Sequence, residues 1–134
     1  MTYYFGKLTP TEYLLLKDKN TIKFSIKTKC FQGIKQFYTT RYLNVLNPDN
    51  FIYNLETEIQ EYLKDKLPGL ELRSNIIFDQ KQFLQFPLSK QFKDSTINPE
   101  TDLNLDIEID KIKINEKTKS YQIILKLIKY EILI

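Results

Sequence analysis

The 134-residue chain contains no histidine, only one cysteine and only three glycines. Without histidine it cannot build a Ser-His-Asp or Cys-His catalytic centre, and it lacks the commonest general base near neutral pH. Histidine-based zinc and iron sites are excluded for the same reason. Gly6, Gly33 and Gly69 are too scattered for a phosphate-cradling loop or a dinucleotide-binding fingerprint. We therefore expect no enzyme activity, no metal site and no cofactor.

The shortage of cysteine and of long apolar runs bears on where the chain works. One cysteine cannot form an internal disulfide, which is typical of a reducing compartment such as cytoplasm, nucleus or organelle matrix. Apolar runs are short, as at Leu14–Leu16, whereas a membrane span needs roughly 20 residues. The first residues show no signal peptide. We expect an intracellular, soluble protein with no membrane partner.

The composition is that of a folded chain with a strong codon bias. Hydrophobic residues make up 42% and aromatic residues 13% of the sequence, which is enough to build a packed core. Eighteen of the twenty basic residues are lysine, and alanine is missing. These preferences follow A/T-rich codons, so we infer an AT-rich genome and give the lysine count little weight. The length predicts a single domain over residues 1–134.

The first half of the chain has the pattern of a β-hairpin. Apolar residues alternate with lysine and serine over residues 21–30, and a period of two is typical of a half-buried strand. Gln32-Gly33 is expected to turn the chain into a second strand, residues 34–46. Cys30 falls on the apolar face of the first strand, so we expect a buried thiol and not a nucleophile.

Residues 47–67 are predicted to form the one helix. Asn47 can cap it, Pro48 suits its first turn, and Pro68-Gly69 ends it. Apolar residues recur at helical spacing and polar residues fill the other side, so the helix should cover one face of a sheet. The apolar stripe consists of Phe51, Ile52, Leu55, Ile59, Leu63 and Leu67.

The remainder of the chain is predicted to be mainly strand. Residues 12–17 fit a strand, but residues 10–17 also fit a short helix that begins with the capping box at Thr9 to Glu12. Short connections favour an antiparallel sheet, strongly curved or closed into a small barrel, with about six to seven strands and helix 47–67 packed on it. This α+β element order resembles that of the OB fold. Further strands are expected at 70–78, 82–88, 101–115 and 120–133, with a loop at 89–100.

Charge is segregated along the chain, although the formal net charge is only +3. Residues 19–48 contain six basic and no acidic side chains, and residues 94–110 contain six acidic and no basic ones. Three explanations remain open. The two strands pair with each other in one sheet; or they meet complementary surfaces of other chains; or the basic hairpin binds single-stranded DNA or RNA.

These patterns define two sets of candidate binding residues. In the basic hairpin, lysine and arginine would contact phosphates and aromatic rings would stack on bases; the set is Lys23, Lys27, Lys29, Lys35, Arg41, Phe37, Tyr38 and Tyr42. The acidic face consists of Asp102, Asp106, Glu108 and Asp110. Neighbours on that strand face are roughly 7 Å apart, too far for two of them to chelate one ion tightly.

The sequence favours a non-catalytic binding or assembly subunit that acts through strand surfaces in a larger protein complex. Its partner would be another protein or a second copy of the chain. The last strand bears on this hypothesis, because it is apolar on both faces in places: such a strand is usually central or covered, and at an edge it would be a template for another chain. The alternative is a single-stranded nucleic-acid-binding, OB-like domain that uses the hairpin 19–46. A carboxylate-dependent enzyme is the third and least favoured hypothesis.

Overall fold

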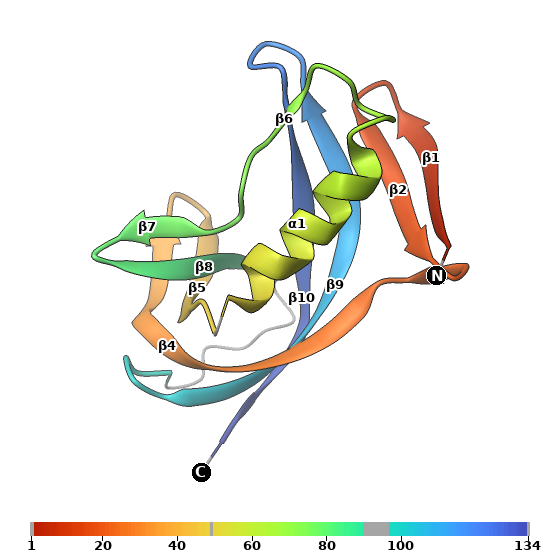
Figure 1. Cartoon of the computed structure of the whole chain (residues 1–134). Coiled ribbons are helices and arrows are strands. Elements are labelled where there is room, and N and C mark those ends of the chain that lie inside the picture. Colours follow the sequence, from red (N-terminus) through yellow and green to blue (C-terminus); the bar gives the residue numbers. More distant parts are fainter. Residues whose placement is uncertain (1, 49, 90–96, 134) are drawn as a thin grey trace.

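The computed structural model describes residues 2–48, 50–89 and 97–133, and Figure 1 shows a curved sheet with one helix packed on it. The predicted α+β class and the mainly antiparallel sheet are confirmed. The elements are β1 (Tyr3–Thr9), β2 (Glu12–Lys17), β3 (Asn20–Thr21), β4 (Lys23–Phe37), β5 (Thr40–Leu46), α1 (Phe51–Leu63), β6 (Glu71–Leu72), β7 (Ile77–Asp79), β8 (Lys81–Leu88), β9 (Asp102–Asn115) and β10 (Ser120–Ile132).

The described strands form a 10-stranded sheet, which is more than the six to seven predicted. The excess comes from β1 and from short strands such as β3, β6 and β7, whose few residues leave little periodic signal. The main strand order is β1-β2-β9-β4-β5-β8-β7, and β10 lies on the other side of β9. No ladder joins the two ends over the described residues, so the sheet is open and the predicted barrel is not confirmed.

The predicted hairpin of β4 and β5 is present, but its turn lies elsewhere. The chain reverses after β4 at Tyr38, and not at Gln32-Gly33. Gly33 has a φ of 73°, and the pairing with β5 shifts register between Cys30 and Ile34. Glycine reaches this conformation without strain and here produces a bulge that bends the strand. The sequence signal was misread because glycine marks turns and bulges alike.

The N-terminal segment is a hairpin, which settles the alternative between helix and strand at residues 10–17. β1 and β2 pair in antiparallel fashion, and Thr9 to Glu12 forms the connection between them. The capping-box reading was therefore wrong, because the residue types that cap helices also favour tight turns. Stacked rings of Phe5 and Tyr13, with centroids 4.5 Å apart, join the two strands.

Helix α1 packs on the sheet and links two parts of the core (Figure 1). Ile52 packs into one hydrophobic cluster, and Ile59 and Leu63 pack into the other. The helix is shorter than the predicted 47–67. Asn50 adopts a left-handed φ of 60°, which interrupts helical geometry before Phe51, so Asn47 lies outside the helix and does not cap it.

The helix also carries a buried carboxylate. Among the described residues, Glu56 is the charged residue that is buried, and only 5% of its surface is exposed. The Ser74 hydroxyl donates a hydrogen bond to one carboxylate oxygen at 2.6 Å. The backbone N–H and the side-chain amide of Asn75 donate to the other oxygen at 2.8 and 3.1 Å. A buried charge is tolerated when such bonds replace its water.

The same segment is attached to β10. The Asn75 amide donates to the carbonyl of Ile123 at 2.6 Å, and the N–H of Arg73 donates to the carbonyl of Tyr121 at 2.7 Å. These bonds continue the short parallel pairing of β6 with the start of β10. The expected strand at 70–78 is therefore two short strands, β6 and β7, separated by a segment that joins the helix to the sheet.

We predict that Glu56→Ala lowers the free energy of unfolding by about 3 kcal/mol, because the donors of Ser74 and Asn75 lose their charged acceptor. Urea denaturation measures this loss. Glu61→Ala is the matched control on the same helix, since Glu61 is exposed and its ion pair with Lys64 lies at the surface. Equal losses of stability in the two variants would contradict the role assigned to Glu56.

Candidate functional site

The basic strand β4 and the acidic strand β9 are neighbours in the sheet. The register places Lys23 opposite Glu108 and Lys29 opposite Asp102. The Lys29 ammonium lies 2.9 Å from the Asp102 carboxylate, and this contact raises the pKa of Lys29. Opposite charges on facing residues stabilise strand pairing. Basic and acidic residues that are separated along the chain therefore lie side by side in the sheet. This is what the first of the three explanations, pairing of the two strands with each other, expects.

Basic residues also flank β9 on its other side. β10 places Lys126 opposite Glu108 and Lys129 opposite Asp106. The Ser25 hydroxyl donates to Asp106 at 2.5 Å, and the Lys129 ammonium lies 3.5 Å from the same carboxylate. The hydrogen bond from Ser25 and then the charge of Lys129 hold the pKa of Asp106 below its ordinary value. The acidic face is thus partly neutralised by the chain itself.

The acidic face does not gather into an ion-binding cluster. Asp110 is exposed and lies where the pairing of β9 with β10 changes register, beside Lys111. Throughout residues 2–48, 50–89 and 97–133, no three Asp, Glu or Cys side chains lie close enough together to hold a metal ion. Sites of that kind need several converging oxygen or sulfur ligands.

The basic hairpin residues do not form one patch. Lys23, Lys27 and Lys29 lie along β4 beside β9, whereas Lys35 lies near the turn, opposite Tyr42 of β5. β4 has 15 residues and also bends, so its two ends are up to roughly 50 Å apart along the strand. The first three lysines are exposed, but Lys23 and Lys29 face acidic residues of β9, whereas Lys35 at the turn faces Tyr42.

Two aromatic rings at that turn are open to solvent. Phe37 is 55% exposed and Tyr38 is 98% exposed. Tyr42 is half-buried, and its ring lies 6.0 Å from that of Phe37. Arg41 follows the turn on β5, paired with Gln36. The turn therefore presents exposed rings and basic side chains together, as the nucleic-acid hypothesis requires of a stacking surface.

Cys30 lies in the core, as its place on the apolar face of the strand predicted. The side chain is 1% exposed and packs in the hydrophobic cluster that contains Ile52. Burial raises the pKa of the Cys30 thiol, although a hydrogen bond with the Gly33 backbone opposes the shift. A thiol that is buried and protonated is a poor nucleophile.

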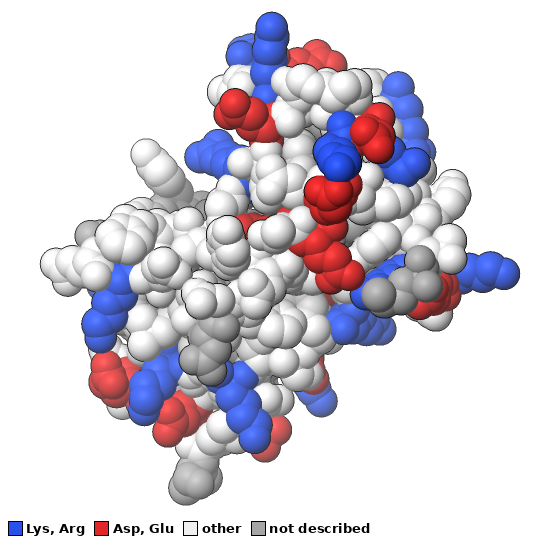
Figure 2. Space-filling model, viewed as in Figure 1, with Lys and Arg blue, Asp and Glu red and all other residues white. Residues whose placement is uncertain are grey.

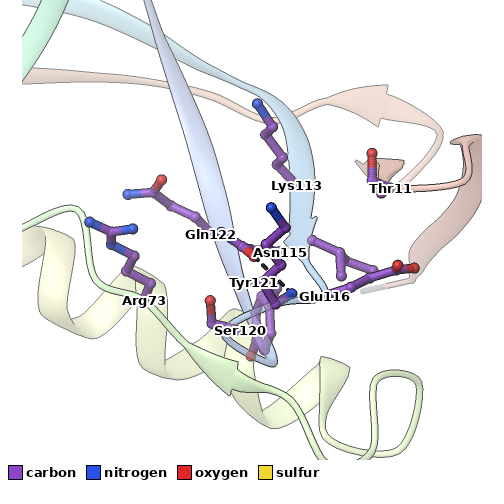
Figure 3. Close-up of a pocket in the computed structure, with 10 residues that line it drawn as sticks. Thr11, Arg73, Lys113, Asn115, Glu116, Ser120, Tyr121 and Gln122 are labelled. Atoms are coloured by element: carbon purple, nitrogen blue, oxygen red, sulfur yellow. Dashed lines mark hydrogen bonds between the residues drawn. The ribbon is translucent and has the colours of Figure 1, made fainter.

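Sequence reasoning missed a cavity of about 420 Å³ near the β9–β10 turn. Figure 3 shows polar and basic side chains from several segments around it. The one feature of the sequence that could have drawn attention to this region is Arg73, because the chain has only two arginines beside eighteen lysines. The side chains with donor groups that line the cavity include Thr11, Arg73, Lys113, Asn115, Lys117 and Gln122.

Sequence reasoning also missed an uncharged face. Figure 2 shows a broad area with few charged side chains over β7, β8 and the first half of α1. Its exposed apolar residues are Phe51, Tyr53 and Phe78, with Phe78 75% and Tyr53 60% exposed. The signal in the sequence is the lack of any charged residue over 74–78 and 82–89. We call this surface the uncharged face.

Comparisons of the chain with protein family models, with curated proteins and with solved structures found no match. In the described chain, no helix is both long enough and apolar enough to cross a membrane. Function is therefore inferred from the geometry and chemistry of the chain's own surfaces, since a fold alone does not determine it.

We predict that Ser25→Ala raises the pKa of Asp106 toward its ordinary value, because the carboxylate loses its strongest hydrogen bond. A carboxyl titration followed by NMR measures the change. With its lowered folded pKa, Asp106 stabilises the fold above its unfolded pKa and loses that effect as the pH falls through the folded pKa. Thr28→Val is the control, since Thr28 on the same strand donates to Leu46. An unchanged Asp106 pKa in Ser25→Ala would refute this assignment.

Proposed function

We propose that the protein is a non-catalytic assembly subunit that binds a second copy of itself through the uncharged face. The observation that supports this is the exposure of Phe51, Tyr53 and Phe78 on a surface with few charges. Exposed apolar patches of this kind mark interaction sites, and aromatic residues are enriched in protein interfaces.

Self-association fits this surface for an electrostatic reason. In a two-fold symmetric contact, the same patch meets itself, so a patch of one charge sign repels its copy. An uncharged face has no such penalty. The strand surfaces of β4, β9 and β10 differ, because their charges are already matched within the sheet.

The strand edge at this face supports the same arrangement. β7 is the last strand in the main order of the sheet, so one of its edges has no strand partner within the described chain. An open edge readily pairs with another strand. Two copies of β7 can pair in antiparallel fashion across a two-fold axis, which would bring the Phe78 side chains of both copies into one interface.

We predict a concentration-dependent dimer in sedimentation velocity, and its loss in Phe78→Lys. An aromatic residue at the centre of an interface contributes at least about 2 kcal/mol, so the dissociation constant should rise roughly thirtyfold or more. Tyr4→Lys is the matched control, because Tyr4 is 56% exposed on β1, outside the uncharged face. A wild-type monomer at every concentration would overturn the proposal.

Single-stranded nucleic acid is a second candidate ligand, and the exposed rings at the β4–β5 turn support it. Phe37 and Tyr38 stand beside Lys35, which is also exposed. Bases stack on such rings without strong sequence preference, while basic side chains contact phosphates. Lys23 and Lys29 contribute less in this hypothesis, since they face Glu108 and Asp102 of β9.

We predict, under this second candidate, that a labelled single-stranded oligonucleotide binds at low salt and is released as salt increases. Tyr38→Ala should weaken binding by about tenfold, which corresponds to the loss of one stacked base. Fluorescence anisotropy measures both effects. Lys81→Gln, at the exposed β7–β8 turn, serves as the control. Absence of binding at low salt would eliminate this candidate.

A further inference from the structure

The cavity near the β9–β10 turn is built on one face of three neighbouring chain segments. Lys113 of β9 is opposite Gln122 of β10, and Arg73 follows β6 at the next position across the sheet. The Arg73 N–H donates to the carbonyl of Tyr121, which fixes this alignment. Adjacent strands are roughly 5 Å apart, so the backbones of Lys113 and Arg73 are about 10 Å apart. Both side chains are long enough to meet over Gln122.

Figure 3 shows Arg73 and Lys113 on either side of Gln122. The core side chains of the same strands, including Ile112 and Tyr121, alternate with them and are buried in the cluster beneath α1. The polar row therefore faces away from the helix. This placement leaves both basic groups accessible to a solute.

The lining of the cavity has an excess of positive charge. Arg73, Lys113 and Lys117 contribute three positive charges, and Glu116 contributes one negative charge. Glu12 lies opposite Lys113 in the sheet, and its carboxylate forms a salt bridge with Lys111 at 2.7 Å, while the charge of Lys113 acts on it from a greater distance. None of the three basic lining residues forms a salt bridge within the described chain. The cavity is thus suited to an anion.

An oriented amide adds a neutral donor. The Asn115 Oδ1 atom accepts hydrogen bonds from the N–H groups of Lys117 and Thr118, at 3.0 and 3.2 Å. This turn fixes the side chain so that its Nδ2 group is left to donate. The donor comes from the same strand face as Lys113, two residues away.

We propose that this cavity is a binding site for a phosphate group, with Arg73 and Lys113 as its charged contacts and the Asn115 amide as a neutral donor. Two net positive charges match a phosphate better than a single carboxylate. The planar guanidinium of Arg73 can bind two phosphate oxygens at once. A volume of about 420 Å³ also admits a group attached to the phosphate, such as a nucleoside.

The test is NMR titration of the full chain with inorganic phosphate, with ATP and with a single-stranded oligonucleotide. Saturable shifts are expected at the Arg73 Nε–H and at the side-chain amides of Asn115 and Gln122. Arg73→Gln and Lys113→Gln should each weaken binding about tenfold or more, because each removes a charge-assisted hydrogen bond. Arg73→Lys should retain part of the affinity, since lysine keeps the positive charge but cannot bind two phosphate oxygens at once as the planar guanidinium does.

Lys7→Gln, on exposed β1, is the matched control and should bind like the wild type. Tightest binding by ATP identifies a nucleotide as the source of the phosphate, and tightest binding by the oligonucleotide identifies a nucleic-acid backbone. Equal affinities identify the free anion, and each of these three results supports the site. The proposal is overturned if no probe shifts the three groups, or if Arg73→Gln and Lys113→Gln bind as tightly as Lys7→Gln.

Discussion

Glu56 on α1 is buried, and its carboxylate is stabilised by hydrogen bonds donated by Ser74 and Asn75. Removing a carboxylate from water costs several kcal/mol unless such donors are held in place. If the segment 73–76 moved away from the helix, the buried Glu56 carboxylate would lose its hydrogen-bond donors. Together with the hydrogen bonds to β10, this constraint fixes a stretch that has no regular secondary structure between β6 and β7.

The same constraint connects the helix with the sheet edge and with the proposed phosphate site. Asn75, held by Glu56, donates to the carbonyl of Ile123 and accepts a hydrogen bond from the Gln122 amide at 3.3 Å. Arg73 lies two residues before Asn75, and its own N–H donates to the carbonyl of Tyr121, so its backbone is fixed next to β10 while its side chain reaches the cavity. A preorganised basic side chain loses less freedom when it binds an anion.

Local patterns in the sequence predicted which faces are buried, but not which segments meet. The alternation over residues 21–30 correctly placed Cys30 on a buried face, because a period of two follows from strand geometry. The pairing of Lys29 with Asp102 joins residues far apart in the chain, and only register determines it. The sequence placed Glu56 on the polar, solvent-facing side of the helix. Its burial could not be predicted, because the groups that donate hydrogen bonds to it come from Ser74 and Asn75, in a segment without helical or strand periodicity. The cavity escaped prediction because its residues converge from separate segments, and Arg73 was the only compositional hint.

The most direct test of this account is amide hydrogen exchange in the wild type and in Glu56→Gln, which keeps the size of the side chain but removes its charge. The account predicts faster exchange at the amides of Arg73 and Asn75 in the variant, because the segment loses its charged anchor, with unchanged exchange at central β9 residues such as Leu105. Unchanged exchange at Arg73 and Asn75 would contradict the claim that the Glu56 carboxylate holds this segment and the site beside it.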